Sequence, residues 1–172
     1  MAINCLRTVF FWPYAPLTFY ILPLFSGQKN MALKRVGTTD SAKLRQIHIR
    51  SCAEVIRLLA TKPSFDDEAK DMTAFLVFNL RGIYETINES VQAWDDRNYW
   101  KKAEDMREKW RWSRTAAQDL TQLVLADQWQ KIPDFLITLL PRFSEVTIRE
   151  ITRDADWWVG ALRALKSGIK QF

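Results

Sequence analysis

The sequence predicts an all-α protein, arranged as an up-down-up-down antiparallel four-helix bundle. Apolar residues recur at intervals of three and four through four long stretches that cover most of the chain after about Ser41. Short links join these stretches, so consecutive helices are expected to be antiparallel neighbours that bury their apolar stripes against each other. The clearest stripe lies in the third stretch and consists of Ala103, Met106, Trp110, Ser113, Ala117, Leu120 and Val124.

The composition is that of one globular domain. The chain has 172 residues, of which 48% are hydrophobic and 26% charged, and this balance argues against disorder. The net charge of +5 favours weak attraction to acidic partners but is far below that of a dedicated nucleic-acid binder. The two cysteines form no C-x-x-C motif, so we expect a reduced, cytoplasmic protein without a zinc or redox site.

Residues 1–30 form an apolar N-terminal segment that differs from the rest of the chain. Thr8–Phe25 carries no charge and as a helix would span about 27 Å, near the lower limit for crossing a bilayer. Three prolines would interrupt such a helix, namely Pro13, Pro16 and Pro23. We therefore weigh a misassigned start with translation beginning at Met31, a loose arm, and a membrane anchor that leaves the domain on the cytoplasmic side. A cleaved secretory signal fits less well, and residues 31–172 are expected to form the single helical domain.

The first two helices have recognisable ends. Helix one is expected to begin near Ser41, where Thr39, Asp40 and Ser41 offer several capping oxygens, and to stop before Pro63. Helix two is expected from about Phe65, with Ser64 as its cap, to Trp94. Its stripe includes Met72, Leu76, Leu80, Ile83, Ile87 and Val91, and Gly82 within it favours a close approach of another helix.

The last two helices follow a polar turn and a second short link. Asn98 is a candidate cap for helix three, which is expected to run to about Asp127. Pro133 suits the first turn of helix four, and Pro141 should kink or split that helix. Beyond the proline the stripe continues to the end of the chain through Phe143, Thr147, Ile151, Ala155, Trp158, Leu162, Leu165 and Ile169.

Motifs for catalysis are absent from the sequence. A dinuclear metal site in a four-helix bundle needs two Glu-x-x-His pairs, whereas His48 is the only histidine and Arg45 stands three residues before it. The sequence also lacks a P-loop, a G-x-S-x-G motif and a G-x-G-x-x-G motif. We expect no enzymatic activity, no cofactor and no metal, and a surface or partly buried His48.

Surplus tryptophans and arginines are the candidate functional residues. Trp112 and Trp157 fall off the stripes that bury Trp110 and Trp158, and each has arginines close by. An off-stripe tryptophan either packs at a second interface or is exposed as a contact residue. The candidate partner-binding residues are Arg107, Arg111, Trp112, Arg114, Arg153 and Trp157.

These features favour a non-catalytic interaction or accessory protein that binds a partner protein or self-associates into a homo-oligomer. A basic protein associated with nucleic acid is an alternative, because arginines form rows on several helices. A membrane-tethered accessory subunit held by residues 8–25 is another alternative. An apolar ligand between the aromatic-rich helices is compatible with the same pattern.

Overall fold

The computed structural model describes residues 40–168, and this part of the chain is all-helical, as predicted. Three long helices come first: α1 (Ser41–Thr61), α2 (Asp67–Asp95) and α3 (Trp100–Leu125). A 3-10 turn η1 (Trp129–Lys131) then leads into α4 (Ile132–Phe143), and a second turn η2 (Ala155–Trp157) precedes the short α5 (Ala161–Lys166).

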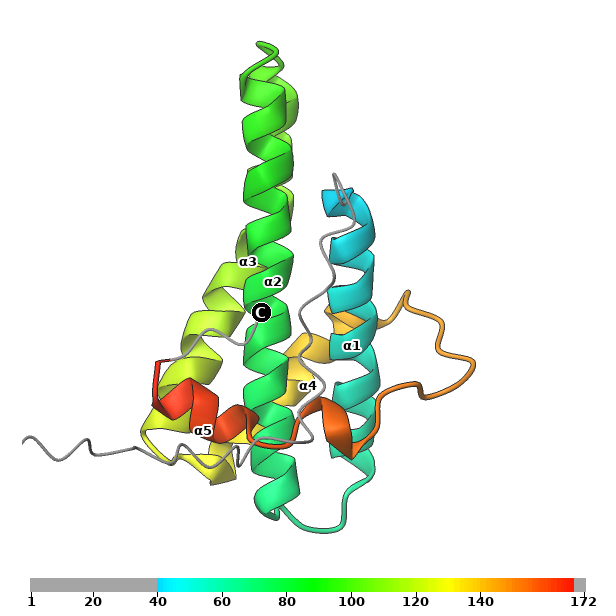
Figure 1. Ribbon diagram of the computed structural model, residues 1–172, viewed down its shortest axis with the longest axis vertical. Coiled ribbons are helices and arrows are strands. Elements are labelled where there is room, and N and C mark those ends of the chain that lie inside the picture. Colours follow the sequence, from blue (N-terminus) through cyan, green and yellow to red (C-terminus); the bar gives the residue numbers. More distant parts are fainter. Residues whose placement is uncertain (1–39, 169–172) are drawn as a thin grey trace, which may run out of the picture.

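Helix α2 is the central element of the fold. Helices α1 and α3 pack along it, and α5 crosses it near its beginning (Figure 1). The carboxylate of Asp71 fixes this crossing by accepting hydrogen bonds from the backbone N–H groups of Gly160 and Leu162, at 3.1 and 2.9 Å. The ends of α2 and α3 nearest their connecting turn extend beyond the start of α1, so the α2–α3 hairpin projects from the other helices (Figure 1).

The predicted stripes of the first three helices form the core. Buried positions include Cys52 and Ile56 of α1, the α2 series from Met72 to Val91, and Ala117, Leu120 and Val124 of α3. A separate small cluster of Ile87, Val91 and Ala103 occupies the projecting hairpin, where Trp94, Met106 and Trp110 cover it. The hairpin therefore has an apolar seam of its own, which the neighbouring helices do not supply.

The helix boundaries confirm one predicted cap and correct two others. Asp40 caps α1, since its carboxylate accepts a hydrogen bond from the Ala42 N–H at 3.1 Å. Helix α2 starts at Asp67, and its cap is Asp66 rather than Ser64, because the Asp66 carboxylate reaches the Ala69 N–H at 2.8 Å. Asn98 does not cap α3: it adopts φ 61° within the turn, a conformation that asparagine tolerates well.

Gly82 lies at a close approach of α1, as predicted. A Cβ at this position would lie 2.6 Å from two atoms of the His48 ring. His48 is buried, which corrects the expectation of a surface or partly buried histidine, and its Nδ1 lies 3.0 Å from Oδ1 of Asn79. The ring thus occupies the space that glycine leaves free on α2.

The prediction of a fourth helix reaching residue 169 was wrong. Helix α4 passes through Pro141 without being split there and ends at Phe143, and residues 144–154 form no helix. Three of the predicted stripe positions are exposed, namely Thr147, Ile151 and Ala155. The physical reason is a long-range contact: the carboxylate of Glu54 binds the backbone N–H groups of Thr152 and Arg153, which a helix would direct to its own carbonyls.

Within residues 40–168, no helix is both long and apolar enough to cross a membrane. The apolar segment 8–25 and the alternative start at Met31 lie outside the described residues, as does Ile169.

Candidate functional site

The arginine ridge predicted on α3 is largely neutralised by carboxylates. Arg107 forms ion pairs with Asp95 and, at 3.0 Å, with Glu104. Arg111 pairs with Glu108 at 2.5 Å and stays 66% exposed. Both arginines therefore present a locally balanced surface rather than a free positive charge.

Arg114 differs from its two neighbours on α3. Its Nη1 donates a hydrogen bond to the Tyr84 hydroxyl at 3.3 Å, and its Cζ lies 5.4 Å from the centroid of the Tyr84 ring. Among the described residues it has no carboxylate partner, so its charge remains available to a ligand.

Trp112 packs at a second interface, one of the two outcomes expected for an off-stripe tryptophan. The half-buried ring stacks on Trp110 at 5.9 Å and meets Phe143 of α4 edge-on at 5.7 Å. The guanidinium of Arg142 lies 5.5 Å from the ring centroid. Trp112 thus joins the end of α4 to α3, and only part of its surface faces solvent.

Arg153 and Trp157 form a different cluster, which contacts α1 rather than α3. The Arg153 guanidinium lies 4.8 Å from the Trp157 ring centroid and 3.7 Å from the Glu54 carboxylate. Trp157 is partly buried against the main core. The structure therefore divides the six sequence candidates into two groups with separate neighbours.

Glu54 is the buried charge that organises this second cluster, and the sequence pattern did not reveal it. Its carboxylate, which is fully buried, accepts hydrogen bonds from Arg50 at 2.7 Å and from the N–H groups of Thr152 and Arg153 at 2.8 and 3.0 Å. Burial opposes ionisation, but these hydrogen bonds outweigh it and lower the pKa of Glu54. A carboxylate so fully engaged serves as an anchor for the chain, not as a base.

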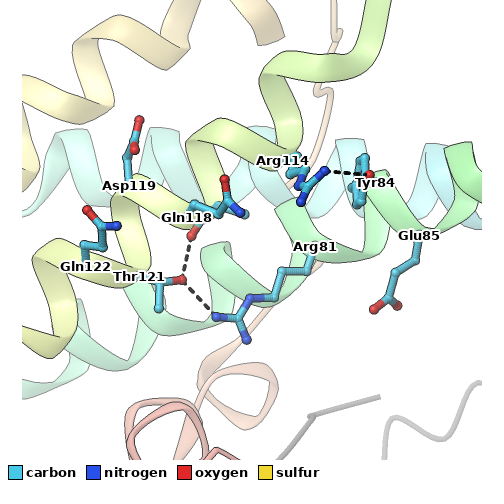
Figure 2. Close-up of a pocket in the computed structure, with 9 residues that line it drawn as sticks. Arg81, Tyr84, Glu85, Arg114, Gln118, Asp119, Thr121 and Gln122 are labelled. Carbon is cyan, nitrogen blue, oxygen red and sulfur yellow. Dashed lines mark hydrogen bonds between the residues drawn. The ribbon is translucent and has the colours of Figure 1, made fainter. Parts of the chain in front are cut away.

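An open hollow between α2 and α3 is lined mainly by polar and charged side chains (Figure 2). Its volume is about 570 Å³. Arg81 enters from α2 and donates a hydrogen bond to Thr121 at 2.9 Å, while Arg114 enters from α3. The remaining lining residues are Tyr84, Glu85, Ala117, Gln118, Asp119 and Gln122.

The end of the projecting hairpin exposes two aromatic side chains. Tyr99 is 58% exposed and Trp100 is 67% exposed, whereas the neighbouring Trp94 is half-buried and lies 4.5 Å from Nζ of Lys102. Neither Tyr99 nor Trp100 is among the sequence-derived candidates. The missed signal was the pair of aromatic residues directly after a polar turn, outside any stripe.

The described residues contain neither a cluster of metal ligands nor a reactive thiol. No group of three or more His, Cys, Asp and Glu side chains in residues 40–168 has the arrangement of a metal site. Cys52 is buried in the core, and burial strongly raises the pKa of its thiol, so it is a packing residue and not a nucleophile.

No protein family, curated protein or solved structure matches the chain.

Proposed function

We propose that the chain is a non-catalytic interaction protein that engages a partner protein, or a second copy of itself, through the end of the α2–α3 hairpin. The observation that carries this proposal is the exposure of Tyr99 and Trp100 where the hairpin projects beyond the other helices (Figure 1). Tryptophan and tyrosine are enriched among the few residues that dominate binding energy at protein interfaces. Large aromatic side chains left in water at a projecting end are suited to insertion into a partner's pocket.

The charges around the aromatic pair favour a protein partner over a nucleic acid. Asp95 ends α2, Asp96 and Arg97 lie in the turn, and Lys101 and Lys102 follow in the first turn of α3. Mixed charge around an aromatic centre is typical of the polar rim of a protein interface, whereas a phosphate backbone selects for an excess of positive charge. The ion pairs of Arg107 and Arg111 reduce that excess further along α3.

Of the sequence-derived candidates, Arg107 and Arg111 extend from this end along α3 and would contribute to the rim. Trp112 packs α3 against Phe143 of α4, and Arg153 with Trp157 belongs to the Glu54 anchor. We also propose that the helices follow the up-down-up-down order of a four-helix bundle, because short connections join α1, α2 and α3.

The proposal is tested by comparing Trp100→Ala with a matched control, Val159→Ala. Val159 is 57% exposed and lies outside the hairpin, so both variants remove an exposed apolar side chain. The affinity of Trp100→Ala for a protein recovered with the tagged full chain should be about thirtyfold or more lower than that of the unaltered chain. This is the loss typical of a hot-spot residue. Val159→Ala should bind as the unaltered chain does. Equal recovery and equal oligomeric mass for all three chains would rule out the hairpin end as the docking site.

A membrane-tethered accessory protein is a second candidate, which one observation favours. Ser41, the first residue of α1, donates a hydrogen bond to Glu89 at 2.7 Å, so the chain enters the fold in the distal half of α2, the half nearer the exposed aromatics. A tether in residues 8–25 would then hold Tyr99 and Trp100 toward the membrane surface. Cell fractionation tests this alternative, and a wholly soluble pool of the native protein would count against it.

A further inference from the structure

The hollow between α2 and α3 presents two oriented guanidinium groups from facing helices. Arg81 is held by its hydrogen bond to Thr121 and lies 5.9 Å from the centroid of the Phe78 ring. Arg114 is held by the hydroxyl and the ring of Tyr84. Because these contacts already restrict both side chains, a ligand that binds them needs to order little.

Neither guanidinium group is neutralised within the described part of the chain. Glu85 and Asp119 also line the hollow, but no ion pair joins either carboxylate to Arg81 or Arg114 within residues 40–168, and Figure 2 shows the Asp119 carboxylate directed away from both guanidinium groups. Two unpaired arginines that share one hollow create a local positive potential which an anion would offset.

The other lining groups add neutral hydrogen-bonding capacity. The Tyr84 oxygen accepts from Arg114, which leaves its own O–H free to donate. Gln118 and Gln122 lie one helical turn apart on α3, and their amides offer both donors and acceptors. The volume of about 570 Å³ falls within the range of small-molecule sites and exceeds the needs of a single phosphate group.

We propose that this hollow binds a small organic phosphate. Arg81, Arg114 and the Tyr84 hydroxyl would contact the phosphate oxygens, because arginine pairs with phosphate through two parallel hydrogen bonds. The two glutamine amides would contact the polar body of the ligand. The site lies along the side of the hairpin and shares no residue with the proposed partner-binding end, so it goes beyond that function and does not depend on it.

Calorimetric titration of the full chain with AMP, adenosine and inorganic phosphate tests the proposal. AMP and adenosine differ only in the phosphate group, so AMP should bind at least about tenfold more tightly, the minimum expected for charge-assisted contacts. Inorganic phosphate should bind more weakly than AMP and compete with it. Absence of AMP binding at millimolar concentration, or equal affinity for adenosine, would overturn the proposal.

Two arginines of α3 provide a matched pair of variants. Arg114→Gln removes a charge inside the hollow, whereas Arg111→Gln removes one from the same helix outside it. AMP affinity should fall about ten- to hundredfold for Arg114→Gln and less than threefold for Arg111→Gln. Equal losses would show that AMP responds only to the overall charge, and this result would overturn the site.

Arg81 is tested by a conservative change, because its removal also breaks the contact with Thr121. Arg81→Lys keeps the charge but loses the planar fork, so AMP affinity should fall at least about threefold while far-UV circular dichroism stays unchanged. Unchanged AMP affinity in a folded Arg81→Lys variant would overturn the assignment of two parallel hydrogen bonds from Arg81 to the phosphate.

Discussion

Gly82→Ala should destabilise the protein, although the same change usually stabilises a helix. Alanine in a helix interior is favoured over glycine by about 1 kcal/mol. At residue 82, however, the new Cβ would lie 2.6 Å from Cε1 and Nε2 of His48 and 2.9 Å from its Cδ2. The ring is buried and held by Asn79, so it cannot simply rotate into solvent.

The expected magnitude follows from these opposing effects. Inserting an extra methyl group into packed surroundings costs about 1–3 kcal/mol. Displacing the His48 ring also weakens its hydrogen bond to Asn79, and a buried polar group left unsatisfied costs about 1–3 kcal/mol. Against a helix gain of about 1 kcal/mol, the net destabilisation should be about 2 kcal/mol.

Urea unfolding followed by circular dichroism measures this effect, and two further variants show its cause. Asn88→Ala at an exposed position of the same helix should raise the free energy of unfolding by up to about 0.7 kcal/mol. In a His48→Ala background, Gly82→Ala should become stabilising by about 1 kcal/mol, because the obstructing ring is gone. If Gly82→Ala has the same effect in both backgrounds, the reasoning from the His48 contact is wrong.

Three other predictions follow from the buried polar groups. Burial lowers the pKa of His48, the only histidine in the sequence, from its unfolded value of 6.5. The unfolded chain therefore binds more protons, and the free energy of unfolding in urea should decline as the pH falls from 7.5 to 5.5. His48→Gln should remove this dependence on pH. Glu54→Gln should lower the free energy of unfolding by about 3 kcal/mol, because an amide oxygen that keeps the Thr152 and Arg153 N–H groups leaves an NH2 donor facing Arg50 and removes the buried negative charge; an unchanged urea midpoint would contradict the anchor. Cys52 should resist maleimide labelling in the native protein and react in urea, as peptide mapping by mass spectrometry would show.

The sequence predicted the helices that rest on local periodicity and failed where a distant contact decides the structure. The stripes of α1, α2 and α3 are buried as expected, since each helix satisfies its own backbone and needs only one apolar face. Residues 144–154 also carry apolar residues at helical spacing, yet their backbone N–H groups bind Glu54, nearly one hundred positions earlier. Spacing alone contains no information on such a partner.

The candidate sites also divide into features that local spacing predicts and features that depend on contacts between helices. Off-stripe geometry limited Trp112 to two outcomes, a second interface or exposure, because its angle on the helix follows from the sequence alone; the contact with Phe143 shows the first. The hollow depends on the register between α2 and α3, which places Arg81 opposite Thr121 and Tyr84 opposite Arg114. Without that register, Arg114 could not be distinguished from the ion-paired Arg107 and Arg111.

The hairpin combines a well-supported base with an outer half that depends on fewer contacts. Around Leu80 and Ile83, helix α2 belongs to the main core, whereas beyond Ile87 the two helices are joined by the small seam with Val91 and Ala103 and by the Arg107–Asp95 ion pair. Tyr99 and Trp100 lie beyond even this seam, so their truncation removes little buried surface and should leave the stability of the protein nearly unchanged. A loss of partner binding by Trp100→Ala would therefore report the contact itself, whereas a variant of the seam would weaken binding by loosening the hairpin.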